Sequence, residues 1–543
     1  MIITIFLHKR ILVSNENQSQ RIGRNLNIMK KKSTQIEEGR TTKALRNMKF
    51  IFVFRIAVLF LNFLARTIFI QKLNIEYLGL DRLFGNVLTL LSFAELGIGN
   101  ALAYHLYKPL AEKDHDSLCS LMHFYKTVYR IIILIILLCG LCLMPFLNYF
   151  VAATEVSQNL QFLYILFLLS TVVSYFFAYD RGLLLADQRG YIVTTVQQMF
   201  SIFKVILQII VLVFFSNYIL YLIIPITMNL LSNIVCSRMA IKIFPFIRDA
   251  DNHPIRKKDK KNFWKEFIGL VSQKIGSVVL TGTDSIFISK FLGLSLLGIV
   301  SNYLLVINTI NSLLNKLIFA ITSSIGNLRV TNEENIAKRK SIFDQIFFIN
   351  VWLYGFISVG LLLMLSPLIT DVWLTQKFEL NFWVLLVLVL QFYINGIHYP
   401  IFTFRTASGY FERFKRIPLI AAFFNIFFDL LLLKFFGLAG IYMATIISRF
   451  CITEVADIYL VFKEEFKMSM KSYYLPYLVF FITNIVLYLV IQFVLKYIVL
   501  FGILGFVVKV LVIIVLYNAI FLVIFWRTKT LRELRKRIYK IIH

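Results

Sequence analysis

The chain has 543 residues, of which 59% are hydrophobic and 16% are charged, and its formal net charge is +28. Apolar runs of about 20 residues, the length of a membrane-crossing helix, recur along most of the sequence. This composition excludes a soluble globular protein and predicts an all-α polytopic membrane protein, because only helices or closed barrels satisfy the backbone in lipid.

In chain order, the apolar runs predict about fourteen transmembrane helices, preceded and followed by basic segments. Residues 1–48 are expected to form a basic cytoplasmic tail, with Met29 and Met48 as alternative start positions. The predicted spans are 49–71, 78–105, 121–147, 159–180, 190–215, 217–241, 264–290, 294–323, 341–369, 381–404, 414–435, 437–462, 472–495 and 500–526.

These spans divide into two lobes of six helices each and two additional C-terminal helices. We expect an N-lobe over 49–244, a cytoplasmic interlobe loop over 245–262 and a C-lobe over 263–462. The two additional helices fall in 463–526, and 527–543 form a second basic cytoplasmic tail.

The distribution of Lys and Arg predicts that both termini are cytoplasmic. Most of the 57 basic residues then lie in the tails and inner loops, as the positive-inside rule requires. The net charge therefore reflects topology and attraction to anionic lipid headgroups. Nucleic acid is not an expected partner, because no separate basic domain is present. The basic residues that fall in outer loops are Lys72, Lys290, Lys377, Lys434 and Lys496.

An internal repeat supports the division into lobes. The segment 68–79 reappears as 286–298 with one residue inserted, and both copies end in a Leu-Gly pair. Gly97–Ala101 is similarly matched by Ser324–Leu328. Repeats of this size in a hydrophobic chain are typical of secondary transporters, with a site between the repeats.

Ionisable side chains inside the spans are the candidates for function, since each costs about 3 kcal/mol at the bilayer centre on insertion scales. In the first span Arg55, Asn62 and Arg66 lie on one helical face. Arg55, Arg66 and Arg82, the last at the start of the second span, have an alternative explanation, because long side chains near a boundary can reach the headgroups.

Two further spans carry similar polar stripes. The fifth has Gln197, Lys204 and Gln208 on one face, and Lys204 is too central to reach the headgroups easily. The seventh, which corresponds to the first in the other half, carries Lys274, for which contact with headgroups is again the alternative. Both halves thus present cations from equivalent helices.

Three acidic residues are candidates for binding a coupling proton or cation: Glu95, Asp284 and Asp429. The alternative is that protonation keeps them neutral without any function. We expect no cofactor, no metal and no enzymatic activity, because the loops contain neither a phosphate-binding glycine loop nor a hydrolase triad spacing.

Several motifs resemble one family, in combination and over most of the chain from Arg46 onward. They are 76–79, 91–101, 106–111, 283–289, 301–303, 324–328, and the stretch from Phe404 through 407–410 to 440–448. They are similar to the Wzx-type oligosaccharide flippases of the multidrug/oligosaccharidyl-lipid/polysaccharide exporter superfamily. Two segments depart from that pattern, since 411–416 is more basic and Asp429 follows Asn425 where a small polar residue is expected.

The resemblance implies a fold and a function. The fold is two six-helix lobes around a central cavity, and the function is to move a polyprenyl-diphosphate-linked sugar repeat unit across the bacterial plasma membrane by alternating access. The implied partners are that glycan, the lipid bilayer and other polysaccharide assembly proteins. Cations would bind the diphosphate and amides the glycan, so the substrate-binding candidates are Arg55, Asn62, Arg66, Gln197, Lys204, Gln208 and Lys274.

Two other functions remain alternatives at this stage. An ion-coupled drug or metabolite exporter of the same superfamily requires a smaller, more aromatic or acidic pocket. A membrane polysaccharide polymerase or ligase is expected to carry a large outer loop with the reaction site, and the predicted outer loops are short.

Overall fold

The computed structural model describes residues 57–92, 98–151, 156–247, 282–331, 336–408, 414, 416–500 and 502–542. The first bundle, which we call the N-lobe, begins with a helix over 57–72. It continues with α2 (Ile75–Leu91), α3 (Ile98–Glu112), α4 (His115–Leu143), η2 (Met144–Phe146), α5 (Leu147–Phe150), α6 (Leu160–Ser174), α7 (Ala178–Ala186), α8 (Gly190–Phe214) and α9 (Tyr218–Ile243).

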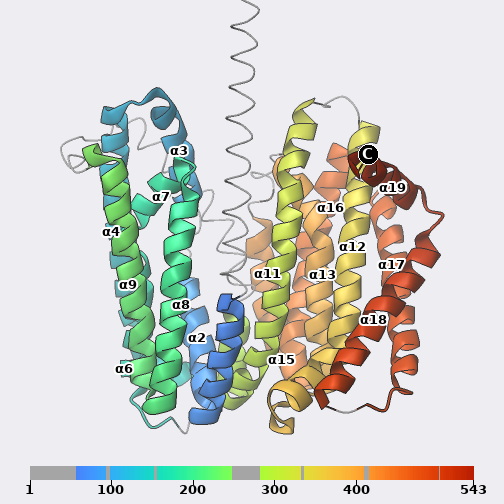
Figure 1. The fold of residues 1–543 in the computed structure, drawn as a ribbon, viewed down its shortest axis with the longest axis horizontal. Helices are drawn as coiled ribbons and strands as arrows, with labels where there is room; N and C mark the ends of the chain where they lie inside the picture. The colour runs from blue at the N-terminus through green and yellow to red at the C-terminus, as the bar shows by residue number, and fades with distance from the viewer. Residues whose placement is uncertain are drawn as a thin grey trace, which may run out of the picture.

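The second bundle, the C-lobe, begins with a helix over 282–291 and lies beside the first (Figure 1). Its first helices are α11 (Leu294–Thr331), α12 (Ile336–Pro367), η4 (Leu368–Trp373), η5 (Gln376–Phe378) and α13 (Phe382–Ala407). They are followed by α15 (Ile417–Ser448), η6 (Arg449–Glu454), α16 (Val455–Ile458), η7 (Tyr459–Glu465), α17 (Lys471–Leu495), α18 (Gly502–Phe525) and α19 (Lys529–Ile542).

Helices of membrane-crossing length dominate both lobes. Ten helices among the described residues are long and apolar enough to cross a bilayer. One of them, over 417–465, includes Gly437 with φ 54° and ψ −129°, where the chain turns between two predicted spans. The prediction of an all-α polytopic membrane protein is confirmed, and the part of the chain that the structure describes contains no β-strand.

Asparagine residues fix the starts of several helices. The side chains of Asn74, Asn159, Asn217 and Asn381 accept hydrogen bonds from backbone N–H groups in the first turns of α2, α6, α9 and α13. These N–H groups have no partner inside the helix, so a side-chain cap both satisfies them and sets where the helix begins.

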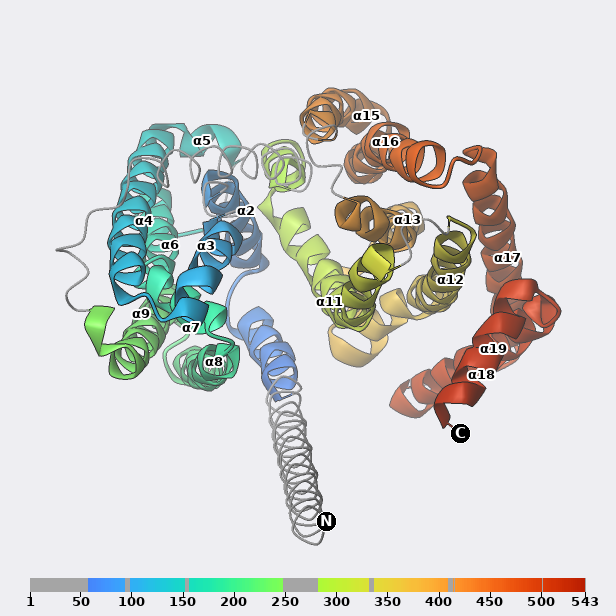
Figure 2. The same cartoon turned by 90° about the horizontal axis from the view of Figure 1, so that it is seen from above.

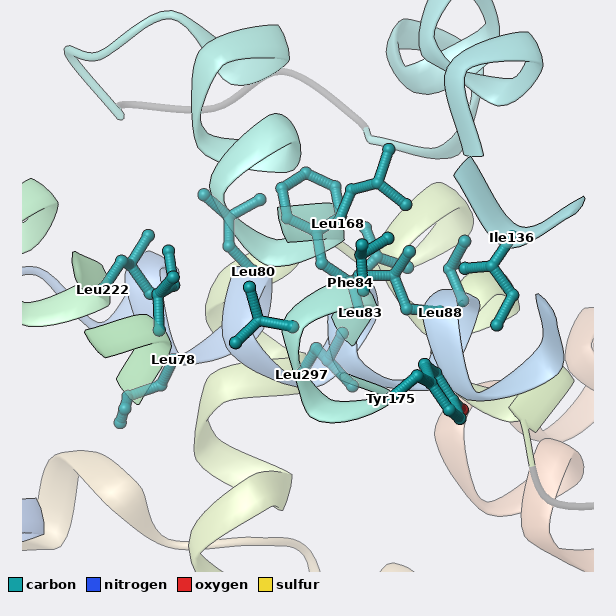
Figure 3. Close-up of a cluster of buried hydrophobic side chains, with 14 of the residues drawn as sticks. Leu78, Leu80, Leu83, Phe84, Leu88, Ile136, Leu168, Tyr175, Leu222 and Leu297 are labelled. Carbon is teal, nitrogen blue, oxygen red and sulfur yellow. The ribbon is translucent and has the colours of Figure 1, made fainter. Parts of the chain in front are cut away.

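α2 forms the centre of the apolar packing in the N-lobe. Figure 3 shows Leu80, Phe84 and Leu88 of α2 among Ile136 of α4 and Leu168 of α6. All five side chains are at most 2% exposed. Burial of this kind contributes about 1.5–3 kcal/mol for each large apolar side chain, which makes α2 a rigid part of its lobe.

The two lobes touch where α2 crosses α11, between the bundles (Figure 2). A Cβ atom built on Gly79 would lie 2.2 Å from the carbonyl oxygen of Leu294, and one on Gly298 would lie 2.5 Å from that of Ile75. The backbones are therefore in direct contact, and only glycine allows this approach. We call this crossing the interlobe contact. Gly79 and Gly298 are the matching last residues of the internal repeat.

Polar bonds surround the interlobe contact. Ser295 on α11 donates a hydrogen bond of 3.1 Å to Glu76 on α2, and the Trp373 indole donates one of 2.7 Å to Thr67. Ser289 donates to the carbonyl of Phe150 at 2.9 Å. These bonds join the lobes at the end of the molecule where α2 and α11 begin.

Candidate substrate cavity and buried acidic cluster

A polar cavity of about 400 Å³ lies between the lobes, immediately beyond the interlobe contact along α2 and α11. Its volume is within the usual range for ligand sites. The side chains that line it are Arg66, Leu78, Asp81, Arg82, Ser301, Leu305, Asn308, Thr309 and Ser312. The N-lobe thus contributes the charges, and α11 contributes hydroxyl and amide groups.

Arg66 bridges the two lobes at this cavity. Its Nε donates a hydrogen bond of 2.9 Å to Asn302 Oδ1, and its Nη2 donates to Ser301 Oγ. A guanidinium carries five N–H donors in a planar fork, so these bonds fix its orientation and leave further donors for a ligand.

Asp81 and Tyr218 support Arg66 from within the N-lobe. The Tyr218 hydroxyl donates a hydrogen bond of 2.7 Å to Asp81 Oδ1, and Asp81 interacts electrostatically with Arg66. Tyr218 is itself held by edge-on packing against Phe69, with ring centroids 5.9 Å apart. Asp81 is not among the site residues predicted from the sequence. The sequence feature that could have identified it is the adjacent charged pair Asp81–Arg82, shortly after the repeat motif, inside a predicted span.

Arg82 is the second cation of the cavity. Its Nε is buried and has no hydrogen-bond partner among the described residues. A buried charged donor without a partner costs desolvation free energy, because it has lost water and gained no hydrogen bond. In native proteins such a group usually has a ligand, water or ion as its partner. From its position in the sequence, contact with headgroups and a position in a cavity were equally expected for Arg82. The structure places it in the cavity.

A buried acidic cluster lies in the C-lobe, between the helix over 282–291 and the two halves of α15. Thr445 Oγ1 lies 3.3 Å and 3.4 Å from the two carboxylate oxygens of Asp284, and Asn425 Nδ2 lies 3.3 Å from Thr445 Oγ1. Thr283 Oγ1 lies 3.4 Å from Asn425 Oδ1. We call these residues, together with Asp429, the acidic cluster.

Asp429 completes the acidic cluster. Its side chain is 0% exposed, and neither carboxylate oxygen has a hydrogen-bond partner in the described part of the chain. It interacts electrostatically with Asp284. Two carboxylates that interact inside a protein repel each other when both are ionised.

Arg82 connects the acidic cluster to the cavity. It lines the cavity, and it also interacts electrostatically with Asp284, as does Arg449 from the C-lobe. Arg449 is held in place by a hydrogen bond to Asn395. A change of charge at Asp284 therefore changes the electrostatic potential at Arg82, which lines the cavity.

A separate ion-pair network crosses the C-lobe. Asp457 Oδ1 forms an ion pair with Arg405 Nε at 2.5 Å, and Asp457 Oδ2 lies 2.9 Å from His398 Nε2. Arg339 pairs with Glu465 at 2.8 Å. These pairs join α12 and α13 to the segment 449–465, much of which is π-helical. Mutual pairing explains how this segment keeps its charges buried.

Most of the described residues that were predicted to bind substrate do not line the cavity. Arg66 lines it, whereas Asn62 and Gln197 are exposed and Lys204 is half-buried on α8. Gln208 is buried, and its Nε2 lies 3.4 Å from the carbonyl oxygen of Tyr221. Arg55, Lys274 and the acidic candidate Glu95 lie outside the described residues. Their proposed roles stay predictions.

Together, the two helical bundles and the polar cavity between them define an all-α polytopic membrane protein. No family model and no curated protein sequence matches the chain.

Solved structures show which known fold this is. A structure of the lipid II flippase MurJ, in an inward closed conformation, covers 88% of this chain and 98% of its own, with 17% identity and a TM-score of 0.62. A MATE family multidrug resistance transporter of the MOP superfamily, in an inward-facing conformation, covers 75% and 95%, with 15% identity and a TM-score of 0.57. At these identities the similarity is one of fold.

Proposed function

We propose that this protein is a flippase that moves polyprenyl-diphosphate-linked oligosaccharide repeat units from the inner to the outer leaflet of a bacterial plasma membrane. The observation that carries the proposal is the interlobe cavity, which Arg66 and Arg82 line together with polar groups of α11. The buried Nε of Arg82 has no hydrogen-bond partner among the described residues. A diphosphate is the ligand that such paired guanidiniums recognise best, because each can form two parallel charge-assisted hydrogen bonds with it. The fold shared with a lipid II flippase supports the same function.

The physical chemistry of the substrate explains why it needs such a cavity. Each sugar hydroxyl stripped of hydrogen bonds costs roughly 2–7 kcal/mol in hydrocarbon, so a glycan of several sugars faces a barrier of tens of kcal/mol. Hydroxyl and amide side chains such as Ser312, Thr309 and Asn308 replace the lost water for the part of the headgroup nearest to α11. The lipid tail needs no such route and stays in the bilayer.

In this proposal the interlobe contact is one of two alternating gates. The direct contact of Gly79 with α11 closes the cavity at the end where α2 and α11 begin. Separation of the lobes at this contact, with each lobe moving as a unit, opens the same cavity to the other side of the membrane. We place the interlobe contact at the outer face, in agreement with the predicted cytoplasmic termini.

We further propose that the acidic cluster couples transport to a proton or cation gradient. Carboxylate, hydroxyl and amide oxygens are the ligands that hard cations prefer, and protonation of Asp284 or Asp429 is the alternative occupant. In both cases the negative charge near Arg82 decreases. The electrostatic potential around this guanidinium then becomes more positive, which strengthens its attraction for a diphosphate.

Deletion of the gene tests the proposed function. We expect lipid-linked repeat units to accumulate in the inner leaflet of the deletion strain, because their headgroups have no other polar route across the membrane. The measurement is the fraction of lipid-linked repeat units accessible to a membrane-impermeant glycosidase in spheroplasts. A plasmid copy of the gene restores accessibility in the control. Normal accessibility in the deletion strain would show that another protein moves this substrate.

Substitution of Asp429 by asparagine tests the coupling. We expect the transport rate in proteoliposomes to stop responding to an imposed proton or sodium gradient, because the variant removes one of the two carboxylates. Glu112→Gln, at an exposed site on α3, is the control and should respond as the wild type does. A gradient response preserved in Asp429→Asn would place coupling outside the acidic cluster.

An ion-coupled exporter of small molecules remains the second candidate. The buried acidic cluster favours it, since a carboxylate pair is also suited to proton-driven export, and the fold is shared with a MATE family transporter. The deletion strain distinguishes the two functions. If the protein is an exporter, we expect the deletion strain to be more sensitive to toxic compounds than the wild type. The distribution of lipid-linked repeat units between the leaflets should then be normal.

A further inference from the structure

The last helix, α19, differs in composition from every helix before it. Its sequence KTLRELRKRIYKII has six Lys or Arg residues and one Glu, interspersed with apolar residues at helical spacing. It begins at Lys529, shortly after α18 ends at Phe525. A basic amphipathic helix so close to the end of a transmembrane helix has the properties of a helix that lies in the headgroup layer.

α19 is docked on the C-lobe through α12. Glu533 Oε2 accepts a hydrogen bond of 2.8 Å from Ser341 and one of 2.9 Å from Gln345, both on α12. Leu531 is 6% exposed and packs into the C-lobe core. The acidic side chain of α19 is thus used to hold the helix against the protein. Figure 1 shows α19 at the same end of the C-lobe as the beginning of α12.

The basic side chains of α19 have a different environment. Arg532, Arg535 and Lys536 are exposed, and the Arg535 guanidinium lies 4.2 Å from the ring centroid of Trp526. Trp526 is 54% exposed at the end of α18. Tryptophan is enriched at the level of the headgroups, so its position indicates the depth at which Arg535 lies.

We propose that the exposed basic residues of α19 form a binding site for anionic phospholipids of the adjacent leaflet. The partner follows from charge complementarity and from depth, because the phosphates nearest to a helix at this level are those of lipid headgroups. The bonds of Glu533 to α12 transmit this attachment to the C-lobe. The leaflet thereby holds one end of α12, the helix against which α13, α17 and α18 also pack.

Native mass spectrometry of the full-length protein, released from mixed phosphatidylglycerol and phosphatidylcholine micelles, tests this proposal. We expect retained phosphatidylglycerol to fall about fivefold in the triple variant Arg532→Gln, Arg535→Gln, Lys536→Gln, because each basic residue contributes to headgroup attraction. The matched control is Lys108→Gln, Lys463→Gln, Lys471→Gln, which removes the same charge from exposed sites elsewhere. An equal loss in both variants would show that net charge alone retains the lipid and would overturn the proposal.

A second variant separates lipid binding from docking. Glu533→Gln keeps every basic residue but weakens the bonds to α12, so phosphatidylglycerol should be retained while amide hydrogen exchange over 529–536 becomes faster. If Glu533→Gln loses the lipid as strongly as the triple variant, the basic face is not the binding site. Retained lipid with faster exchange supports both parts of the proposal.

Discussion

Gly79→Ala is expected to reduce transport more than about tenfold, because the added methyl carbon would lie 2.2 Å from the backbone carbonyl oxygen of Leu294. The backbone of α2 cannot move away within the N-lobe, since the apolar side chains of α2 are packed in the core of that lobe. The clash is relieved only when the lobes separate. The variant therefore populates the conformation with the interlobe contact closed less than the wild type does.

The measurement combines transport in proteoliposomes with spin-label distances between the lobes. Labels at the exposed positions Lys72 and Lys377, after replacement of the five native cysteines, report the separation at the interlobe contact. Gly85→Ala is the control on the same helix, because a Cβ there meets nothing within 4 Å. Wild-type transport and an unchanged distance distribution in Gly79→Ala would contradict a gating role for this contact.

Arg82→Ala is expected to weaken binding of a polyprenyl diphosphate about 10- to 100-fold, the equivalent of one or two charge-assisted hydrogen bonds. The reason is that Arg82 lines the cavity and that its buried Nε has no partner among the described residues. Binding of undecaprenyl diphosphate to the purified protein, measured by microscale thermophoresis, provides the comparison. Arg82→Lys should recover part of the affinity, because it restores the charge without the planar fork.

Arg189→Ala is the matched control for this prediction. Arg189 lies on the surface of the N-lobe, where it pairs with Asp187 at 2.6 Å, and it does not line the cavity. Its loss should leave the affinity within about twofold of the wild type, as expected for an exposed ion pair. Equal affinity in Arg82→Ala and wild type would remove the cavity from the proposed mechanism.

The sequence predicted the fold class well because its determinants are local. A run of apolar residues has no stable state in lipid other than a helix, whatever its neighbours are. The repeat ending at Gly79 and Gly298 was visible in the sequence, and these are the residues at which the lobes meet. That they touch each other was not predictable from the repeat, since similarity between two segments does not say that they pack together.

The site was less predictable, because helical periodicity gives a shared face without giving its direction. Gln197, Lys204 and Gln208 share a stripe on α8, yet they do not line the cavity. Arg82 is close to a predicted span boundary, where the sequence alone does not distinguish contact with headgroups from a position in a cavity. Asp284 and Asp429 were each selected for being charged inside a span, but only tertiary packing brings them into one cluster.

The turn at Gly437 has a consequence for the acidic cluster. In a straight helix Asn425 and Thr445 would lie about 30 Å apart at 1.5 Å per residue. The reversal of the chain at Gly437 brings Asn425 Nδ2 to 3.3 Å from Thr445 Oγ1. The tip is tight, since a Cβ on Gly440 would meet the carbonyl oxygen of Leu432 at 2.2 Å. Gly437, with its positive φ, therefore sets the register of two antiparallel rods. A side chain introduced at Gly437 would strain the turn and shift the two halves of α15 relative to each other. The shift would change the position of Asp429 relative to Asp284, although neither residue is mutated.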